Sequence, residues 1–247
     1  MQARATEFDQ GRHSRGKIGF VLLQTEQTIE DDMFAIIPRD VGVHFSRVRI
    51  SDTINVATLG RMVDGLAEGA RMIIPDAKLD VICYACTSGS IVIGEKQVVA
   101  ELKAGAPGAV ATTLVTGVVR ALRAFGAKKI VVGTPYLDEI NDLERTFLIE
   151  KGFEVLDLRG LNIALDSDMV RVTPRFLLDF AESLNRKDAD AIFISCGALR
   201  SVEIIEELER RVNKPVVVSN QAMAWDTMRL AGVVDPVSGF GRLLHEH

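Results

Sequence analysis

The sequence lacks the features of secreted and membrane proteins. It has three cysteines in 247 residues, too few for a disulfide framework, so a reducing compartment and a cytoplasmic location are expected. No apolar run approaches the roughly 18 residues that a membrane span requires. The segment from Met1 to Arg15 is polar and has no apolar core of the kind found in signal peptides. We therefore expect a flexible leader over residues 1–16 and no membrane partner.

Basic charge and metal ligands are also scarce. The net charge is −5, so the chain has no basic footprint and nucleic acid is excluded as an expected partner. Cys83 and Cys86 form a single CxxC pair, with no second pair to complete a tetrahedral metal site. The sequence contains no GxGxxG, Walker A or GxSxG motif. We therefore expect neither a metal nor an organic cofactor.

Short apolar runs alternate with amphipathic segments along the chain. Apolar runs typical of buried parallel strands lie at 17–23, 81–85, 129–133 and 191–195. Further strands are expected at 109–112, 153–158 and 215–219, and an alternating segment at 41–45 indicates a strand with one exposed face. Helical spacing predicts helices at 56–74, 94–103, 114–126, 140–152, 176–184, 202–212 and around 225. Residues 160–171 are rich in Asn and Asp and are expected to form a loop. Thr28 is expected to cap a further helix that begins near Ile29. The alternation predicts an α/β protein with mainly parallel sheets flanked by helices.

The ends of the predicted strands are small and polar. In parallel sheets ligands bind beyond the carboxyl ends of the strands. Those ends carry residues 24–28, 86–90, 134–136, 196–199 and 219–221, and two of them contain a thiol. Their similarity predicts one site that is built from two like halves.

Cys86 is the first candidate for chemistry. A thiol at a helix N-terminus experiences unpaired N–H groups, which lower its pKa and favour the thiolate. Thr87 and Ser88 are small enough to let backbone amides approach a carboxylate. The alternative is a buried structural cysteine, which is how we interpret Cys83 in the middle of its strand.

Cys196 repeats this pattern, followed by Gly197 and Ala198. Two thiols on opposite sides of a bound carbon atom allow one to remove a proton while the other returns one. Alternatively, one thiol adds covalently and the other protonates the product. Neither route requires a cofactor.

Four further residues have two interpretations each. Tyr136 is either a hydrogen-bond donor to a substrate carboxylate or an aromatic residue at the rim. Asp166 is either a polar contact or a turn residue. Asn220 and Gln221 either line the site or cap the last helix.

Four segments resemble a known family. Residues 84–89, 134–136, 195–200 and 219–225 are similar to motifs of the aspartate/glutamate racemase superfamily. The branch that they resemble most is that of maleate cis–trans isomerase and arylmalonate decarboxylase, which includes the related ectoine-utilisation proteins. The resemblance extends over residues 17–244.

The resemblance implies two pseudo-symmetric α/β lobes with the active site in the cleft between them. We expect a first lobe at 17–113 with 221–247, and a second lobe at 114–220. It also implies that Cys86 adds to an alkene carbon, that Cys196 handles the proton and that Tyr136 binds a carboxylate. The other expected substrate-binding residues are Thr25, Glu26, Thr87, Ser88, Asp166, Gly197 and Ala198.

Two departures from the family pattern concern the substrate. The isomerases carry Asn where this chain has Glu26 and, in a later loop, near Asp166. A carboxylate beside a dicarboxylate substrate in a dry cleft costs on the order of several kcal/mol. We therefore expect a cofactor-independent isomerase or racemase of a small carboxylate, either maleate or an amino-acid derivative that carries a cationic or amide nitrogen.

Two alternatives follow from the same residues. The first is a decarboxylase of the arylmalonate type, although those enzymes keep only the second cysteine and commonly have Gly at the first. The second is a non-catalytic protein that binds a small carboxylate. In each case we expect a homo-oligomer, since symmetric dimers are the commonest assembly.

Overall fold

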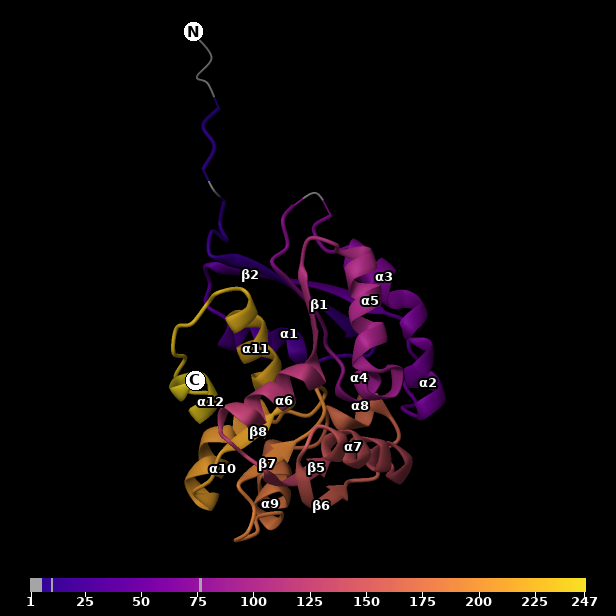
Figure 1. Ribbon diagram of the computed structural model, residues 1–247, viewed down its shortest axis with the longest axis vertical. Coiled ribbons are helices and arrows are strands. Elements are labelled where there is room, and N and C mark those ends of the chain that lie inside the picture. Colours follow the sequence, from indigo (N-terminus) through magenta and orange to yellow (C-terminus); the bar gives the residue numbers. More distant parts are fainter. Residues whose placement is uncertain (1–5, 10, 76) are drawn as a thin grey trace.

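The computed structural model describes residues 6–9, 11–75 and 77–247, and its architecture is two four-stranded parallel sheets flanked by helices (Figure 1). The first sheet has the order β2-β1-β3-β4, with β1 (Gly16–Leu23), β2 (Val41–Val48), β3 (Val81–Tyr84) and β4 (Val110–Thr113). The second has the order β6-β5-β7-β8, with β5 (Lys129–Thr134), β6 (Glu154–Gly160), β7 (Ala191–Ile194) and β8 (Val216–Val218). All pairings are parallel. The predicted α/β class is confirmed.

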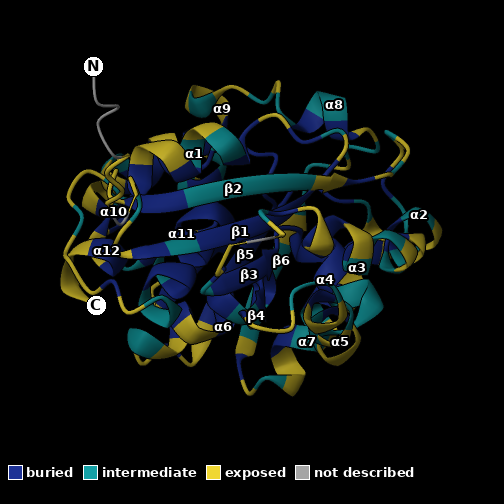
Figure 2. Ribbon diagram, turned by 90° about the horizontal axis from the view of Figure 1, so that it is seen from above, coloured by how far each residue is buried: buried dark blue, intermediate teal, exposed yellow. Residues whose placement is uncertain are grey.

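The second sheet repeats the strand order of the first. In each sheet the first strand of the half lies between the second and the third, and the fourth lies at the edge. Consequently β3 and β7 occupy equivalent places. Strands β1, β3, β5, β7 and β8 are buried over almost their whole length, whereas β6 and the start of β4 are partly exposed. The middle of β2 is also partly exposed (Figure 2), as its alternating sequence predicts.

The helices connect these strands and cover the sheets. The first half contains α1 (Ile29–Ile36), α2 (Val56–Arg61), α3 (Val63–Arg71), α4 (Thr87–Ile93), α5 (Glu95–Gly105) and α6 (Leu114–Ala124). The second half contains α7 (Asp138–Glu150), α8 (Asp166–Met169), α9 (Pro174–Ser183), the 3-10 helix η1 (Val202–Ile204), α10 (Ile205–Val212), α11 (Ser219–Leu230) and α12 (Arg242–Glu246).

Local details differ from the sequence-based expectations. The predicted helix at 56–74 is two helices, because the N–H of Met62 bonds to the carbonyl of Leu59 in a tight turn. The loop predicted at 160–171 contains α8, whose first N–H, at Asp166, bonds to the carbonyl of Asp52 at 2.9 Å. Part of the predicted leader, residues 1–5 and 10, lies outside the described residues; its end is held by ion pairs of Arg15 with Asp40 and Asp235.

The predicted cap of α1 is also wrong. Thr28 occupies the N-cap position, but its hydroxyl donates to the carbonyl of Ala198 at 3.0 Å instead of capping the helix. The residue that binds the free N–H groups of α1 is Glu26.

Helices α6 and α11 join the two halves. Helix α6 follows β4 of the first sheet and contacts β8 of the second, whereas α11 follows β8 and contacts β3 and β4 (Figure 1). The two helices pack closely at Gly117, where an added Cβ would lie 3.0 Å from the carbonyl oxygen of Ala222. The predicted lobe boundaries at 113/114 and 220/221 stay a prediction.

A buried carboxylate strengthens this contact. Asp226 of α11 is nearly fully buried, accepts a hydrogen bond from Thr112 of β4 at 3.0 Å and pairs with Arg120 of α6 at 2.9 Å. In the part of the chain that the structure describes, no helix is both long and apolar enough to cross a membrane.

We expect Asp226→Ala to lower the free energy of unfolding by about 2 kcal/mol, because it leaves the Thr112 hydroxyl buried without an acceptor and Arg120 without its partner. Urea denaturation measures this change. The control is Asp179→Ala, which removes an exposed carboxylate from α9 and should cost no more than about 0.5 kcal/mol. An equal loss in both variants would contradict the role assigned to Asp226.

Candidate active site

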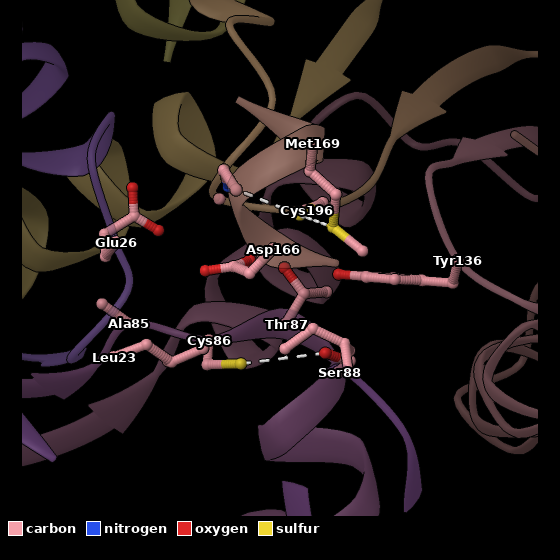
Figure 3. A pocket seen from close by; sticks show the side chains of 13 residues that line it. Leu23, Glu26, Ala85, Cys86, Thr87, Ser88, Tyr136, Asp166, Met169 and Cys196 are labelled. Atoms are coloured by element: carbon pink, nitrogen blue, oxygen red, sulfur yellow. Dashed lines mark hydrogen bonds between the residues drawn. The ribbon is translucent and has the colours of Figure 1, made fainter. Parts of the chain in front are cut away.

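One cavity lies at the carboxyl ends of the strands of both sheets (Figure 3). It has a volume of about 20 Å³, roughly enough for one water molecule, so a substrate can enter only if lining side chains move. It is lined by Leu23, Glu26, Ile54, Ala85, Cys86, Thr87, Ser88, Tyr136, Asp166, Met169, Cys196, Gly197 and Ala198.

The two cysteines of this cavity hold equivalent places in the fold. Cys86 is the second residue after β3, and Cys196 is the second residue after β7. Strands β3 and β7 occupy equivalent places in the two sheets. The repeated strand order therefore brings one thiol from each half to the same cavity. Both side chains are buried, at 7% and 5% exposure, so neither is freely accessible to solvent.

Cys86 is the N-cap residue of α4. Its sulfur accepts a hydrogen bond from the N–H of Gly89 at 3.2 Å and lies 3.8 Å from the hydroxyl of Ser88. A side chain at position 89 would not fit, since an added Cβ would lie 2.3 Å from the hydroxyl of Tyr84 and 3.0 Å from the sulfur of Cys86. Gly89 therefore allows the helix to begin directly beside the thiol.

Burial overrides the helix N-terminus in setting the protonation state of Cys86. Removal of the thiolate from water raises the pKa of Cys86 from 9.0 to about 11, although the hydrogen bonds from Gly89 and Ser88 lower it. The charge of Asp166 also raises it. The predicted lowered pKa is therefore wrong for the ligand-free protein, in which Cys86 is a thiol at neutral pH.

Cys196 lies in a different local structure. Its backbone φ is +97°. Residues other than glycine rarely adopt this conformation, which costs roughly 1–3 kcal/mol. Its sulfur accepts the N–H of Ala198 at 3.4 Å. The expected helix N-terminus is absent from this described turn, because the chain continues irregularly and η1 begins only at Val202. The analogy with Cys86 therefore holds for the strand but not for the helix.

Two residues at the start of α11 hold the Cys196 turn. The hydroxyl of Ser219 accepts the N–H of Cys196 at 3.0 Å and lies 3.0 Å from the hydroxyl of Thr87, so it links the turns of both cysteines. The amide of Asn220 donates to the carbonyl of Gly197 at 2.8 Å and to Asp32 of α1 at 2.7 Å. The strained turn is thus held by the first two residues of α11, which are themselves bonded to α4 and α1.

The pKa of Asp32, the carboxyl group that Asn220 contacts, is shifted by its surroundings. Burial raises the pKa of Asp32 to about 7, with the charge of Glu26 adding to the effect, whereas the hydrogen bond from Asn220 lowers it. Asn220 neither lines the cavity nor caps α11, so both sequence-based interpretations of this residue are wrong.

The thiol of Cys196 faces Tyr136 and Met169 (Figure 3). Burial raises the pKa of Cys196 well above its usual value, and the charge of Asp166 acts in the same direction. The neighbouring Tyr136 hydroxyl lowers the pKa and so opposes both effects. Tyr136 is itself held by α7, because Asn141 donates to its carbonyl at 3.1 Å.

Glu26 and Asp166 bring two carboxyl groups to the cavity. Asp166 accepts a hydrogen bond from the Thr25 hydroxyl at 2.5 Å, and Glu26 accepts three backbone N–H groups at the start of α1. Burial raises the pKa of both carboxyl groups. Within the described chain, the lining residues include no Arg, Lys or His to balance them.

The cavity brings together all but one of the residues expected from the sequence. Thr25 does not line it and acts through Asp166. Sequence reasoning missed four lining residues, which are apolar and carry no distinctive pattern: Leu23, Ile54, Ala85 and Met169. It also missed Ser219, although that residue lies in one of the five strand-end segments. Among the described residues, no cluster of acidic, Cys or His side chains is able to hold a metal ion.

Comparison with known proteins relates this arrangement to two activities. A maleate isomerase of Nocardia farcinica is 29% identical over 242 residues, which cover 93% of this chain and 96% of that protein. An arylmalonate decarboxylase of Bordetella bronchiseptica is 37% identical over 144 residues, which cover 57% of this chain and 60% of that protein.

A solved structure extends the likeness to three dimensions. It is that of a Cys-to-Ser mutant of the Nocardia farcinica maleate cis–trans isomerase with a covalently bound succinylcysteine intermediate. It is 26% identical, covers 94% of this chain and 99% of the other, and superposes with a TM-score of 0.85. The family model for arylmalonate decarboxylase matches residues 52–244, which include both cysteine turns. The chain therefore belongs to the arylmalonate decarboxylase family, in the branch that it shares with the maleate isomerases.

Proposed function

We propose that this protein is a cofactor-independent isomerase that acts on a small carboxylate through Cys86 and Cys196. The observation that carries the proposal is the pair of thiols, one from each half of the molecule, on a single cavity. The relative with a succinylcysteine intermediate supports covalent addition of a thiol in this branch. The absence of basic residues from the described cavity lining leaves hydrogen-bond donors such as Tyr136 to bind the substrate carboxylate.

The proposed reaction is balanced without a redox partner. The Cys86 thiol first releases its proton to water and takes one up again after the product leaves. In between, its thiolate sulfur forms a bond to one alkene carbon, and the electron pair of the double bond moves to the neighbouring carbon. Cys196 supplies a proton to that carbon and takes it back after rotation about the new single bond. The carbon–sulfur bond then breaks and the double bond forms again in the other geometry. In a racemase, the same two thiols would remove and return an α-proton.

The remaining expectations also belong to the proposal. We propose a cytoplasmic homo-oligomer whose partner is a small molecule, with neither nucleic acid nor membrane as a target. We also propose the substrate-contacting roles of Thr87, Ser88, Gly197 and Ala198, and the division into lobes at 113/114 and 220/221.

Decarboxylation of an arylmalonate is the second candidate, because a protein of that name is 37% identical over part of the chain. The presence of a cysteine at position 86 as well as 196 favours two-sided chemistry over decarboxylation. Release of carbon dioxide from a substituted malonate that persists in Cys86→Ser would reverse this order.

We expect Cys86→Ser and Cys196→Ser each to lower turnover by about 10³-fold or more, because the serine hydroxyl is a far weaker acid and nucleophile. Proton NMR in D2O measures geometric isomerisation and deuterium incorporation with maleate, aspartate, glutamate, N-acyl diamino acids and arylmalonates. Cys83→Ser is the matched control, since Cys83 is buried in β3 away from the cavity. Full activity without either cavity thiol would reject the two-cysteine mechanism, and ligand binding without turnover of any compound would favour a binding protein.

We expect alkylation of Cys86 by iodoacetamide to be slow at neutral pH and to rise about tenfold per pH unit until the pH approaches 11, because burial raises the pKa of this thiol to about 11. The thiolate fraction at pH 7 is then roughly 1 in 10⁴. Mass spectrometry of the Cys86 peptide, in the Cys196→Ser variant, measures the rate. A plateau below pH 9 would show that the helix N-terminus outweighs burial.

We expect Asn220→Ala to lower kcat roughly 10- to 100-fold while KM changes less, because Asn220 positions the Cys196 turn and does not line the cavity. Steady-state kinetics separate the two parameters. Gln221→Ala is the matched control: it removes a buried amide from the next position, which caps α11 by accepting the N–H of Val218 and donates to the carbonyl of Phe240, but does not bond to the Cys196 turn. Equal losses of kcat in the two variants would indicate a general effect on stability, which thermal unfolding would reveal.

A further inference from the structure

The side chain of Glu26 occupies an anion-binding position of the protein itself. Its Oε1 atom accepts the backbone N–H groups of Gln27 at 2.9 Å, Thr28 at 2.6 Å and Ile29 at 3.0 Å. Ile29 is the first residue of α1, and Gln27 and Thr28 lie in the turn that leads into it. Free N–H groups at such a position would otherwise attract an anionic ligand. The side chain is 6% exposed and lines the cavity. This end of the cavity is therefore already filled by a carboxylate that belongs to the chain.

Asp166 places a second carboxyl group on the cavity. It is 5% exposed, and its Oδ2 atom accepts the hydroxyl of Thr25. Figure 3 shows its carboxyl group between Cys86 and Cys196, with which it lines the cavity. Its charge raises the pKa of both thiols.

Among the described residues, the cavity lining supplies no cation to compensate these two groups. The lining residues in the described part of the chain include none with a basic side chain. The guanidinium of Arg47 is near, but it donates to the carbonyls of Leu23 and Glu26 and pairs with Glu30. A dicarboxylate would thus bring two negative charges into a buried site that presents two carboxyl groups, and like charges placed together in this way weaken binding strongly.

The opposite end of the cavity has a different character. It is formed by Thr87, Ser88 and Tyr136, whose hydroxyl groups are neutral donors (Figure 3). These hydroxyl groups are available to bind one carboxylate of the substrate on the side of the cavity away from Glu26. The cavity therefore has a donor end and an acceptor end, with the thiols on its walls.

We propose that the substrate is a monocarboxylate whose other end carries N–H donors, as an ammonium or amide group does, and that Glu26 and Asp166 bind this nitrogen. The inference rests on the proposed isomerase function for the identity of the reaction. It excludes a simple dicarboxylate such as maleate as the preferred substrate. It assigns Glu26 and Asp166 to specificity, whereas the thiols perform the reaction.

The test compares maleate with maleamate, its monoamide, which has the same carbon skeleton and differs only in an amide in place of one carboxylate. Binding is measured by calorimetry with Cys86→Ser, and turnover by proton NMR with the intact protein. We expect maleamate to bind about 100-fold more tightly than maleate, because the second carboxylate of maleate lies beside the carboxyl groups of Glu26 and Asp166 and this repulsion weakens its binding. Selective binding without turnover would support the inference and reject the isomerase function.

Substitution of the two carboxyl groups tests their role directly. Glu26→Gln keeps a carbonyl oxygen for the N–H groups of α1, and Asp166→Asn keeps an acceptor for Thr25, so both variants preserve the local fold. We expect the preference for maleamate to fall at least tenfold in each single variant and further in the double variant. Asp168→Asn is the matched control, because this carboxylate lies on the same short helix but is exposed and pairs with Arg171.

Two results would overturn the inference while leaving the proposed function intact. One is maleate that binds as tightly as maleamate, or more tightly, in a protein that isomerises it. The other is a preference for maleamate that survives in the double variant. A change in Asp168→Asn as large as in Asp166→Asn would likewise show that the effect is one of net charge and not of contact with the substrate.

Discussion

The hydroxyl of Ser219 holds together the two turns on which the cavity depends. It accepts the backbone N–H of Cys196 from one half and contacts Thr87, the neighbour of Cys86, from the other. Cys196 has a backbone conformation that is unfavourable for any residue with a side chain. Such a turn persists only because Ser219 and Asn220, at the start of a buried helix, bind it on both sides. The relative position of the two thiols is thus set by α11 and not by the turns alone.

Burial is the second constraint on this site. It raises the pKa of both thiols and of the carboxyl groups of Glu26 and Asp166, because each charged form loses its hydration. Local hydrogen bonds from Gly89 and Ala198 act in the opposite direction but are outweighed. Cys86 is therefore a thiol at neutral pH. The cavity has room for about one water molecule, so little solvent is present beside the two thiols.

Much of the fold was predictable from the sequence for a clear reason. Buried parallel strands read as continuous apolar runs, and both cysteines stand at the point where such a run ends. The sequence patterns predicted the wrong local structure where contacts between distant segments determine it. Met62 interrupts an amphipathic segment that reads as one helix, and α8 forms where Asp166 is bound by the carbonyl of Asp52. The Thr28 hydroxyl likewise serves Ala198, which is distant in the sequence.

The sequence by itself determined the α/β class, the repeat of two similar halves and the identity of the two thiols, because these depend on local patterns of apolar and small polar residues. The tertiary structure alone decided which carboxyl groups face the thiols, how Ser219 and Asn220 hold the Cys196 turn and how far burial shifts each pKa. These properties depend on distances between segments that are far apart in the chain and on the exclusion of water, neither of which a local pattern records.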